Sequence, residues 1–471
     1  MPRPLHGRTA ELAELHRLAG LARSGSPQLV VLFGRRRVGK TFLLRRFLEQ
    51  LDPAETAYHG CTYLSADEEM RTLLAEPAIA SRVDTLLASE TFAEGLARLA
   101  DAAADRLLVV AIDEMPYLLG GDDHVVAAIQ QLWDRMVEKP TKLLLILTGS
   151  SISTMTRVVS SRGALFARPT KLMQLQPFDF PTSASFLGID SESPPEQRRA
   201  VLEARAACGG YPLLLDRWDV NASADQNLRT MAGGPLDPLI AMSSVLLLDL
   251  PDARGVRSVL TAIGRGVHKH GEIQSRADQR IDAALSTLTA GGFVRSVQPI
   301  GSKEQKGARK LYRIADEHLR FYFAIVDPYR QLFEADQGVA VLAGSQARWA
   351  TLVQAMFESD ARDHAVRLTR EGAFGAPLVV GEWWLSNRQQ QTQIDVVGID
   401  PMSGSWRLAG EVKWVARFGA NDLRHLDEAF RLAGPVAVGA ERRIWVPSPD
   451  VVTIPSGMTV RVHTLADFFA P

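Results

Sequence analysis

Apolar residues in the first part of the chain fall into two patterns. Leu12, Leu15, Leu18 and Leu21 recur at helical spacing and predict an amphipathic helix over residues 9–22. Short apolar runs predict buried strands at residues 29–33, 56–64, 107–112, 143–148 and 171–175. Helices are predicted between them at residues 42–51, 89–103 and 124–137. Apolar strands that alternate with helices indicate a parallel sheet covered on both faces, so we expect one α/β domain over residues 1–180.

The remaining sequence changes its pattern twice. Residues 181–235 are mostly helical in pattern, with a Gly-Gly-Tyr-Pro turn at residues 209–212. Two helical stretches then precede two short strands, the order of a winged helix-turn-helix, which we place at residues 236–323. The stretches are residues 253–264 and 278–290, and the strands are residues 293–297 and 310–314.

A last domain follows a helical linker at residues 324–343. It spans residues 344–471, and its predicted strands are residues 377–385, 393–399, 406–413 and 443–446. The fold class that we expect is therefore multidomain α/β, with an N-terminal parallel sheet, a helical region, a winged helix-turn-helix and a C-terminal α/β domain.

Composition narrows the class of protein without choosing a function. Of 471 residues, 46% are hydrophobic and 23% are charged, which is ordinary for a folded, water-soluble chain. The formal net charge is −1, so any affinity for nucleic acid must come from a local basic face. Cys61 and Cys208 are too few and too far apart for a disulfide framework or a zinc cluster. Without an apolar signal or a membrane-spanning run, we expect a cytoplasmic protein with no membrane partner.

One loop carries a complete phosphate-binding pattern. After the strand at residues 29–33 the sequence reads GRRRVGKT, which matches G-x-x-x-x-G-K-[ST] at every fixed position. The loop consists of Gly34, Arg35, Arg36, Arg37, Val38, Gly39, Lys40 and Thr41. Glycine lets backbone N–H groups approach phosphates closely, and the helix that follows directs its positive end at the anion. Lys40 can reach the β- and γ-phosphates and Thr41 can offer a hydroxyl to Mg²⁺, so we expect ATP and Mg²⁺ as ligands.

Polar residues follow two more buried strands. Asp113 and Glu114 end the strand at residues 107–112, where ligands bind in open α/β sheets. We expect Asp113 to hold Mg²⁺ and Glu114 to polarise the attacking water; the alternative is a helix N-cap at a strand exit. The strand at residues 143–148 ends in Thr148, followed by Gly149, Ser150 and Ser151. A polar group there could sense the γ-phosphate, or the segment could form a plain Gly-Ser turn.

These motifs together resemble a known family. The segments LHGR, GRRRVGKT, IDEMPYL, LTGSS and GGYP are similar to those of the archaeal-type ATPases in the STAND class of P-loop NTPases. The resemblance covers essentially the whole chain and implies a helical lid over residues 181–235. It also implies that Pro212 lies near the nucleotide base, whereas without the family Pro212 is only a turn between helices. The developing charge on the γ-phosphate needs another cation, for which the family favours Arg168 over Arg162, acting in the same chain or across a subunit contact. Either could instead be an exposed structural arginine.

Basic residues gather around the winged helix-turn-helix. Arg276, Arg280 and Arg295 lie in or near the expected recognition helix. The loop between the two strands carries Lys303, Lys306, Arg309 and Lys310. Phosphate contacts of this kind give DNA affinity that is salt-sensitive and independent of sequence. Winged helices also serve as protein–protein modules or spacers, and that alternative stays open.

The last domain carries two carboxylates and a lysine on neighbouring strands. Asp395 lies on residues 393–399, and strand periodicity places Glu411 and Lys413 on one face of the next strand. If the strands form a hairpin, two carboxylates and an ammonium converge, and Glu358 could add a further ligand. Asp395 and Glu411 would bind Mg²⁺ and Lys413 would act on a water. A surface Glu-x-Lys pair is the plain alternative.

The segments QIDVVGID and GEVKW resemble the PD-(D/E)XK nuclease-like domain found after the ATPase and winged helix in this family. Ile394 replaces the proline of that motif. The resemblance implies an ATP-hydrolysing protein that acts on DNA and carries a metal-dependent endonuclease-like domain. The alternative is a non-cutting, nucleotide-gated regulator or scaffold, in which the nuclease-like fold only binds. A homo-oligomer is compatible with both.

Overall fold

Contacts divide the chain into two compact units. The structure is a computed structural model that describes residues 4–83, 91–119, 123–138, 141–161, 163–301, 310–386, 391–415, 417–454 and 459–469. The first unit is Met1–Pro177 and the second is Phe178–Pro471. Within the described residues, no helix is long and apolar enough to cross a membrane.

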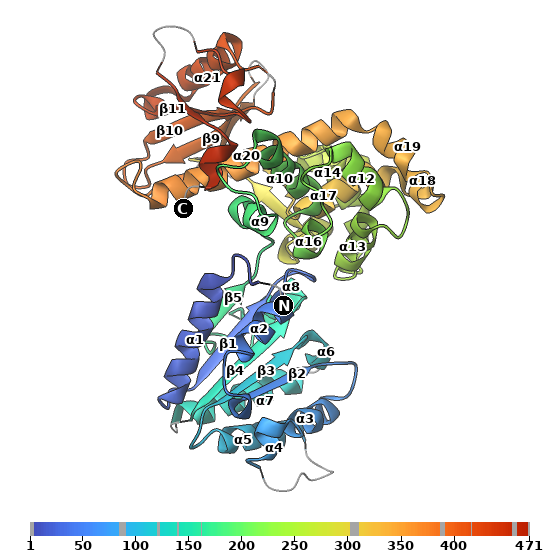
Figure 1. Cartoon of the computed structure of the whole chain (residues 1–471), viewed down its shortest axis with the longest axis vertical. Coiled ribbons are helices and arrows are strands. Elements are labelled where there is room, and N and C mark those ends of the chain that lie inside the picture. Colours follow the sequence, from blue (N-terminus) through green and yellow to red (C-terminus); the bar gives the residue numbers. More distant parts are fainter. Residues whose placement is uncertain are drawn as a thin grey trace. The chain divides into compact units, whose positions relative to one another are not determined.

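A parallel five-stranded sheet forms the centre of the first unit (Figure 1). Its strands are β1 (Gln28–Phe33), β2 (Thr56–Gly60), β3 (Leu108–Asp113), β4 (Leu143–Gly149) and β5 (Lys171–Gln174). They lie in the order β2-β3-β4-β1-β5, and every neighbouring pair is parallel. β1, β3 and β4 are buried along their whole length, as a sheet covered on both faces requires. The predicted α/β fold of this region is confirmed.

Helices connect these strands and supply the rest of the core. They are α1 (Thr9–Arg23), α2 (Lys40–Leu48), α3 (Ala66–Leu74), α4 (Pro77–Ala80), α5 (Phe92–Ala102), α6 (Pro116–Leu119), α7 (Asp123–Glu138) and α8 (Ile152–Val159). The sequence predicted one of them to start at residue 89, but α5 starts at Phe92. The cause is a capping box, in which Thr91 and Glu94 bond each other's backbone N–H groups.

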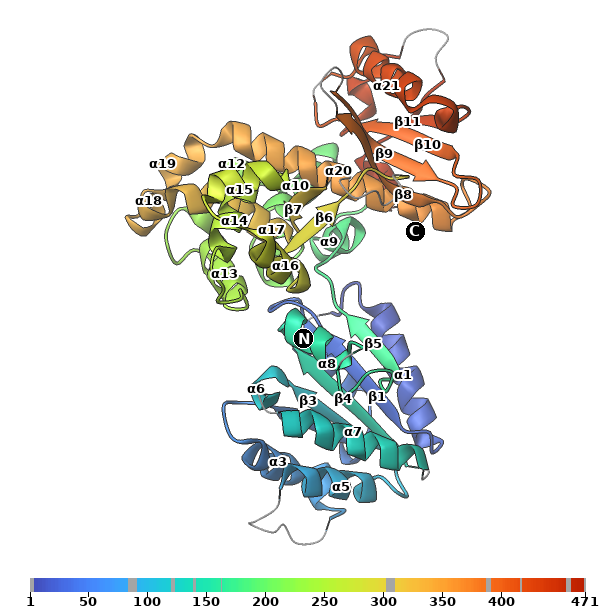
Figure 2. The same cartoon turned by 180° about the vertical axis from the view of Figure 1, so that it is seen from behind.

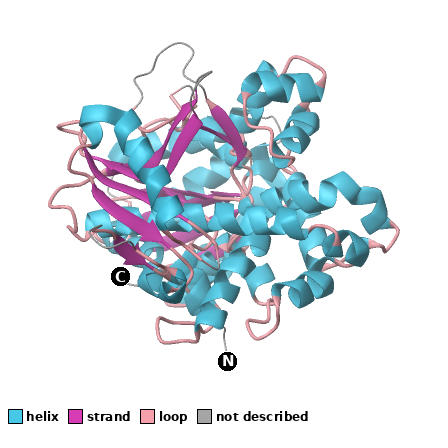
Figure 3. Cartoon of the chain, turned by 90° about the horizontal axis from the view of Figure 1, so that it is seen from above, coloured by secondary structure: helices cyan, strands magenta, loops and turns pink. Residues whose placement is uncertain are grey.

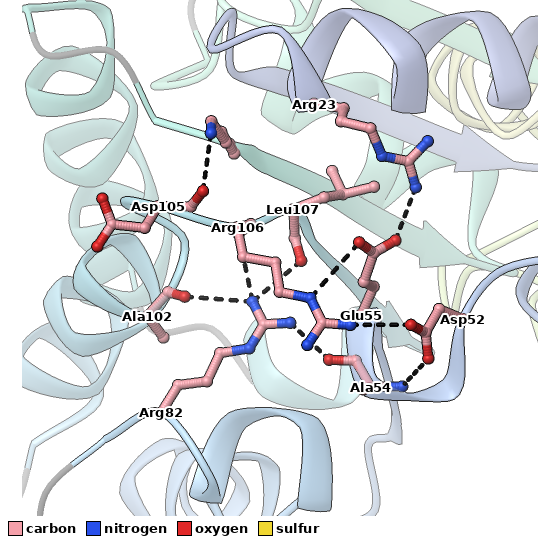
Figure 4. A network of polar contacts seen from close by, with 10 residues as sticks. Arg23, Asp52, Ala54, Glu55, Arg82, Ala102, Asp105, Arg106 and Leu107 are labelled. Carbon is pink, nitrogen blue, oxygen red and sulfur yellow. Dashed lines mark hydrogen bonds and ion pairs between the residues drawn. The ribbon is translucent and has the colours of Figure 1, made fainter.

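A polar network joins the segments that precede β2 and β3 (Figure 4). Arg82 donates to the carbonyl oxygens of Ala102 and Leu107 at 3.3 and 3.0 Å. Arg106 bonds Asp52 at 2.8 Å, and Arg23 bonds Glu55 at 2.7 Å. These contacts lie at the amino ends of the strands. They leave the carboxyl ends, where polar residues follow β1, β3 and β4, for other chemistry.

The second unit begins with helices. They are α9 (Phe180–Phe186), α10 (Pro195–Cys208), α11 (Pro212–Leu215), α12 (Ala224–Ala232) and α13 (Pro238–Leu247). The sequence pattern indicated helices over residues 181–235, but α13 lies beyond that region and was not predicted. Next come α14 (Val256–Gly264), α15 (His270–Ala277) and α16 (Asp282–Ala290), and then the antiparallel hairpin of β6 (Val294–Val297) and β7 (Leu311–Ile314), drawn in yellow in Figure 2. The prediction of one helix over residues 278–290 was wrong at its start and missed α15. Asp278 adopts a left-handed conformation (φ 50°), which ends α15 and separates it from α16.

A second sheet occupies the C-terminal part of this unit; Figure 3 distinguishes strands (magenta) from helices (cyan). Short helices lead to it: α17 (Glu317–Phe321), η2 (Tyr322–Val326), η3 (Asp327–Tyr329), α18 (Arg330–Glu334) and α19 (Gly338–Ala343), then the long α20 (Gln346–Arg370). The strands are β8 (Val379–Ser386), β9 (Gln391–Ile399), β10 (Trp406–Val412), β11 (Glu441–Trp445) and β12 (Arg461–His463), with α21 (Ala420–Ala433) between β10 and β11. β8, β9 and β10 pair antiparallel, and β10, β11 and β12 pair parallel.

Ion pairs join the parts of the second unit. Arg205 on α10 bonds both carboxylate oxygens of Asp360 on α20, at 3.0 and 2.8 Å, and both side chains are buried. Arg313 on β7 bonds both oxygens of Glu382 on β8 at 2.7 Å. The helices, the hairpin and the C-terminal sheet thus form one unit. The finer boundaries at residues 235, 323 and 343 stay predictions.

Candidate functional site

The glycine-rich loop leads directly from β1 into α2. Gly34 adopts φ 159°, and a Cβ there would lie 2.4 Å from the carbonyl oxygen of Leu175. Gly39 precedes the first residue of α2 and adopts φ 102°, a conformation that L side chains rarely take. The two glycines are needed for different reasons, the first because space is short and the second because of its backbone angle.

Lys40 lies inside the curve of this loop. Its Nζ donates to the carbonyl oxygens of Gly34 and Arg35 at 2.9 and 3.2 Å, and its side chain is buried. The ammonium is therefore held where the backbone turns around it, next to the N-terminus of α2. Positive charge from the lysine and from the helix end coincides there, which suits a bound phosphate.

Asp113, the last residue of β3, is surrounded by hydroxyl groups. Thr41 donates to Oδ2 at 2.6 Å, Tyr58 donates to the same oxygen at 2.8 Å, and Thr148 donates to Oδ1. Burial raises the pKa of Asp113, but the hydrogen bonds from Thr148, Thr41 and Tyr58 outweigh it, so the pKa lies below its ordinary value. Asp113 is accordingly an ionised carboxylate beside the hydroxyl of Thr41, a pair of oxygen donors that fits Mg²⁺.

Glu114 is held by the end of the neighbouring strand β4. The hydroxyl of Ser150 donates to Glu114 Oε2 at 2.8 Å, and the Ser150 backbone N–H donates to it at 3.3 Å. Glu114 itself adopts φ 55°, which a non-glycine residue rarely takes. Strained backbone of this kind is concentrated at functional sites, where it directs a side chain.

The other residues of the loop have structural contacts. Arg36 donates to the Tyr117 hydroxyl at 3.3 Å, and Arg37 adopts φ 67° in the turn. From outside the loop, Arg8 donates to the carbonyl oxygen of Gln176 at 2.6 Å and to that of Val38 at 3.4 Å. The Gly-Arg start of the chain therefore connects the loop to the end of β5.

Sequence reasoning missed two residues of this site. Tyr58 donates to Asp113 from β2, and Thr148, which was considered only as a sensor, bonds the same carboxylate. A polar residue in an otherwise apolar strand was the available signal. That these strands flank β3 could not be read from the sequence.

A second group of ionisable side chains lies on the C-terminal sheet. β9 and β10 form the antiparallel pair that the sequence analysis required, with Gly410 opposite Val396. Asp395 Oδ2 accepts from the Val412 backbone N–H at 3.0 Å, so Asp395 lies against the end of β10. Asp395 and Glu411 are both buried, at 5% and 1% exposure.

We call this group the carboxylate–lysine cluster; it consists of Glu358, Asp395, Glu411 and Lys413. Its charges shift the pKa values of the two buried carboxylates in opposite directions. Lys413 Nζ lies 3.0 Å from Glu411 Oε2. Burial and the negative charges of Glu358 and Glu411 raise the pKa of Asp395 well above its ordinary value. Burial raises the pKa of Glu411 as well, but the hydrogen bond from His425 and the charge of Lys413 bring it below the ordinary value.

Gln354 positions the helix that brings Glu358 to the cluster. Its amide donates to Glu358 Oε1 at 2.9 Å and to the Val412 carbonyl oxygen at 2.8 Å. It also accepts from the Trp414 backbone N–H at 2.7 Å. Glu358 was expected from the sequence, but Gln354 and His425 were not, because neither belongs to the motif.

A pocket of about 640 Å³, which we call the basic hollow, is lined by residues of α14, α15, α17 and α20. Its lining includes Arg265 at the end of α14, Arg276 on α15, Arg320 on α17 and Arg348 on α20. Of the loop lysines and arginine considered in the sequence, Lys303, Lys306 and Arg309 lie outside the described residues.

Comparisons with known proteins bear on the domain that holds the first of these sites. Residues 8–216 match the family described as "ATPase domain predominantly from Archaea". The protein is an ATPase. Residues 322–425 match a second family, described as archaeal and bacterial proteins of unknown function. An uncharacterised protein of Methanocaldococcus jannaschii is 24% identical over 401 residues, which cover 83% of this chain and 84% of that protein.

Two solved structures share less sequence identity with the chain than the Methanocaldococcus jannaschii protein does. The Walker-type ATPase PABY2304 of Pyrococcus abyssi has a TM-score of 0.49 and 20% identity, covering 69% of this chain and 99% of that chain. The ORC2 protein of Aeropyrum pernix in its ADPNP–ADP complexes has a TM-score of 0.46 and 14% identity, covering 74% of this chain and 96% of that chain. With TM-scores below 0.5, these likenesses support no functional conclusion.

The ATPase does not bring Arg168 to its own phosphate loop. Arg168 bonds both carboxylate oxygens of Asp134 on α7, at 3.0 and 3.1 Å. Two residues later, the Thr170 backbone N–H donates to the carbonyl oxygen of Leu29, at the amino end of β1. The loop follows the carboxyl end of β1, about 13 Å away at the rise of a strand. Arg168 thus lies at the opposite edge of the sheet from the loop of its own domain, and a role across a subunit contact stays a prediction. Arg162 lies outside the described residues.

Pro212 of the ATPase is the first residue of α11, in the second unit. Gly209 and Gly210 before it have φ 63° and 75°, and a Cβ on Gly210 would lie 2.3 Å from the Phe178 carbonyl oxygen. The turn after α10 therefore packs closely against the residues that lead into α9, where a side chain on Gly210 would not fit. Its coupling to the nucleotide stays a prediction, because Pro212 and the loop belong to different units.

Proposed function

We propose that the ATPase is a STAND-type enzyme that hydrolyses Mg·ATP at the site between β1, β3 and β4. The loop Gly34–Thr41 and Lys40 would bind the phosphates, and Thr41 and Asp113 would hold Mg²⁺, which neutralises phosphate charge. Glu114, fixed by Ser150, would orient and polarise the attacking water. The convergence of Thr41, Tyr58 and Thr148 on Asp113 supports this assignment, because three hydroxyl donors keep the carboxylate ionised.

We propose further that the second unit acts on DNA. The order α14, α15, α16 and the hairpin β6–β7 is that of a winged helix-turn-helix. The basic hollow supports binding of a polyanion: among the described residues, neither Arg265 nor Arg276 has an acidic partner within ion-pair distance. Guanidinium groups without such a partner are available to phosphate.

The carboxylate–lysine cluster supports metal-dependent DNA cleavage as the reaction of this unit. Asp395 and Glu411 would hold Mg²⁺, with Glu358 nearby, and Lys413 would stabilise charge that develops at the attacked phosphate. The single observation that carries this proposal is the meeting of buried Asp395 and Glu411 at the ends of paired strands, with Lys413 Nζ 3.0 Å from Glu411 Oε2; burial and the neighbouring carboxylates also raise the pKa of Asp395. A bound divalent cation would favour the ionised form of Asp395, because its positive charge offsets both the cost of burial and the repulsion from the neighbouring carboxylates.

Nicking of plasmid and branched DNA tests the proposal. Wild type, Asp395→Ala, Lys413→Ala and the control Asp427→Ala are incubated with Mg²⁺ or Mn²⁺, with and without ATP. Asp427 lies on α21 of the same domain and bonds Arg442 at 3.0 Å, away from the cluster. We expect cleavage by wild type and Asp427→Ala, and none by the two cluster variants. Cleavage that survives Asp395→Ala would come from a contaminant or another site.

The alternative is a nucleotide-gated regulator that binds DNA without cutting it. One observation favours it. No choice of one carboxylate oxygen each from Glu358, Asp395 and Glu411 places all three oxygens within 4.8 Å of one another. Under this reading no variant cleaves under any condition, while wild type still binds DNA in an ATP-dependent manner.

A further inference from the structure

A group of three metal-binding side chains lies in the first unit, away from the phosphate loop. His59 is on β2, Cys61 follows that strand, and Glu69 is on α3. One ligand atom from each lies within 4.8 Å of the other two, and no other such group of three occurs in the described part of the chain. All three residues are buried, at 6%, 6% and 2% exposure.

The local structure explains why these side chains meet. Residues two apart on an extended chain project to the same face, so His59 and Cys61 both face α3. Glu69 is fixed from the other side: its Oε1 accepts from the Thr62 backbone N–H at 2.6 Å and from the Thr62 hydroxyl at 2.9 Å. Its Oε2 faces His59 Nε2 at 2.6 Å. Hydrogen bonds to the outer oxygen of a carboxylate are the contacts that orient a metal ligand.

We propose that His59, Cys61 and Glu69 form a binding site for Zn²⁺. An imidazole, a thiol and a carboxylate are a donor set that suits Zn²⁺, whereas Mg²⁺ prefers oxygen alone. Zinc–ligand bonds of about 2.0–2.3 Å place tetrahedral donors about 3.3–3.6 Å apart. His59 and Glu69 therefore need to separate by less than about 1 Å, and the three protein donors leave a fourth position open.

The site lies beside the catalytic carboxylates but shares no ligand with them. The Cys61 backbone N–H donates to the carbonyl oxygen of Asp113 at 2.9 Å. A bound ion would therefore fix the end of β2 against β3 and join it to α3. Zinc binding is expected to raise the melting temperature of the first unit, because an ion that binds only the folded state stabilises it.

The other reading is a plain hydrogen-bonded pair of His59 and Glu69 packed against a thiol. Cobalt(II) separates the two readings, because a Co²⁺–thiolate bond gives a near-ultraviolet charge-transfer band that nitrogen and oxygen ligands do not give. The chain has two cysteines, and Cys208 is buried on α10 without a comparable partner group among the described residues. Cys208→Ser is therefore a matched control.

The experiment titrates the chelator-treated chain of 471 residues with Co²⁺ and then with Zn²⁺. We expect the band in wild type, in Cys208→Ser and in Lys40→Ala, its loss in Cys61→Ser, and its disappearance when Zn²⁺ displaces Co²⁺. His59→Gln and Glu69→Gln retain the thiol and should weaken Co²⁺ binding at least about tenfold, which tests the site if Cys61→Ser fails to fold. No band in wild type, or a band that persists in Cys61→Ser, would overturn the proposal. Equal Co²⁺ affinity in wild type and both glutamine variants would do the same.

Discussion

Asp113 and Asp395 are both buried strand aspartates, at 2% and 5% exposure, yet their surroundings act in opposite directions. Asp113 receives hydrogen bonds from three hydroxyl groups, which lower its pKa despite burial. Asp395 faces the carboxylates Glu358 and Glu411, and burial and their charges raise its pKa. Burial by itself therefore does not decide the charge of a carboxylate; the donors that neighbouring elements supply decide it. Asp113 is therefore favoured as an anion before any metal arrives, whereas a nearby cation would favour ionisation of Asp395.

The largest expected difference is in ATP affinity when the lysine of each site is replaced. Lys40→Ala should weaken ATP binding more than about a hundredfold, because the phosphates lose the ammonium that the loop holds. Lys413→Ala should leave ATP binding unchanged, since it belongs to the other unit. Calorimetric titration of both variants with Mg·ATP checks this. Wild-type affinity in Lys40→Ala would refute the phosphate site.

Replacing one glutamate in each site should change the rate of ATP hydrolysis in the first site only. Glu114→Gln should retain ATP but turn it over about a hundredfold more slowly, because the water loses its base. Glu411→Gln is the matched change in the second unit and should hydrolyse ATP at the wild-type rate. Steady-state phosphate release measures both, and unchanged turnover in Glu114→Gln would move the base to another residue.

Replacing each aspartate by asparagine should change stability with opposite signs. The lowered pKa of Asp113 means that its contribution is present above the unfolded pKa and is lost as pH falls through the folded pKa. Asp113→Asn should therefore destabilise the first unit at neutral pH, by about 1–3 kcal/mol for the hydrogen bonds to a charged group. The raised pKa of Asp395 means that stability falls as pH rises above the unfolded pKa.

Asp395→Asn should accordingly stabilise the second unit at neutral pH in the presence of a chelator. It should also lose the stabilisation that Mg²⁺ gives to wild type. Thermal melts at neutral pH, with chelator and with Mg²⁺, report both effects. Destabilisation of both variants without metal would mean that the two aspartates do not differ in the way their surroundings indicate.

The smallest expected effect is in the basic hollow. Arg276→Glu should reduce the slope of log affinity against log salt for duplex DNA by about one unit, as one lost phosphate contact predicts. Arg229→Glu is a control on α12, where Arg229 pairs with Asp225 at 2.7 Å. Anisotropy titrations over a range of salt concentrations measure the slopes. Equal slopes for wild type and Arg276→Glu would assign the hollow to another ligand.

The sequence by itself determined those features that contiguous residues specify. The loop Gly34–Thr41 is a continuous motif between a strand and a helix, and Asp113-Glu114 directly follows an apolar run, so both could be located without coordinates. The strands β9 and β10 were located in the same way, but their antiparallel pairing entered only as a condition, which the structure meets. Local periodicity and short loops suffice in these cases, because the partners lie close together along the chain.

Tertiary structure decided everything that depends on the order of strands. Tyr58, Thr41 and Thr148 reach Asp113 from three different elements, and their meeting follows from a sheet order that the sequence does not state. The same packing puts Arg168 at the amino edge of the sheet, away from the loop Gly34–Thr41 of its own domain. It also gathers His59, Cys61 and Glu69, although the sequence offered too few cysteines to indicate a metal site. The contacts to Asp113 join residues that are distant along the chain, whereas the group of His59, Cys61 and Glu69 needs α3 to pack against the end of β2. Both therefore depend on how the sheet and helices pack.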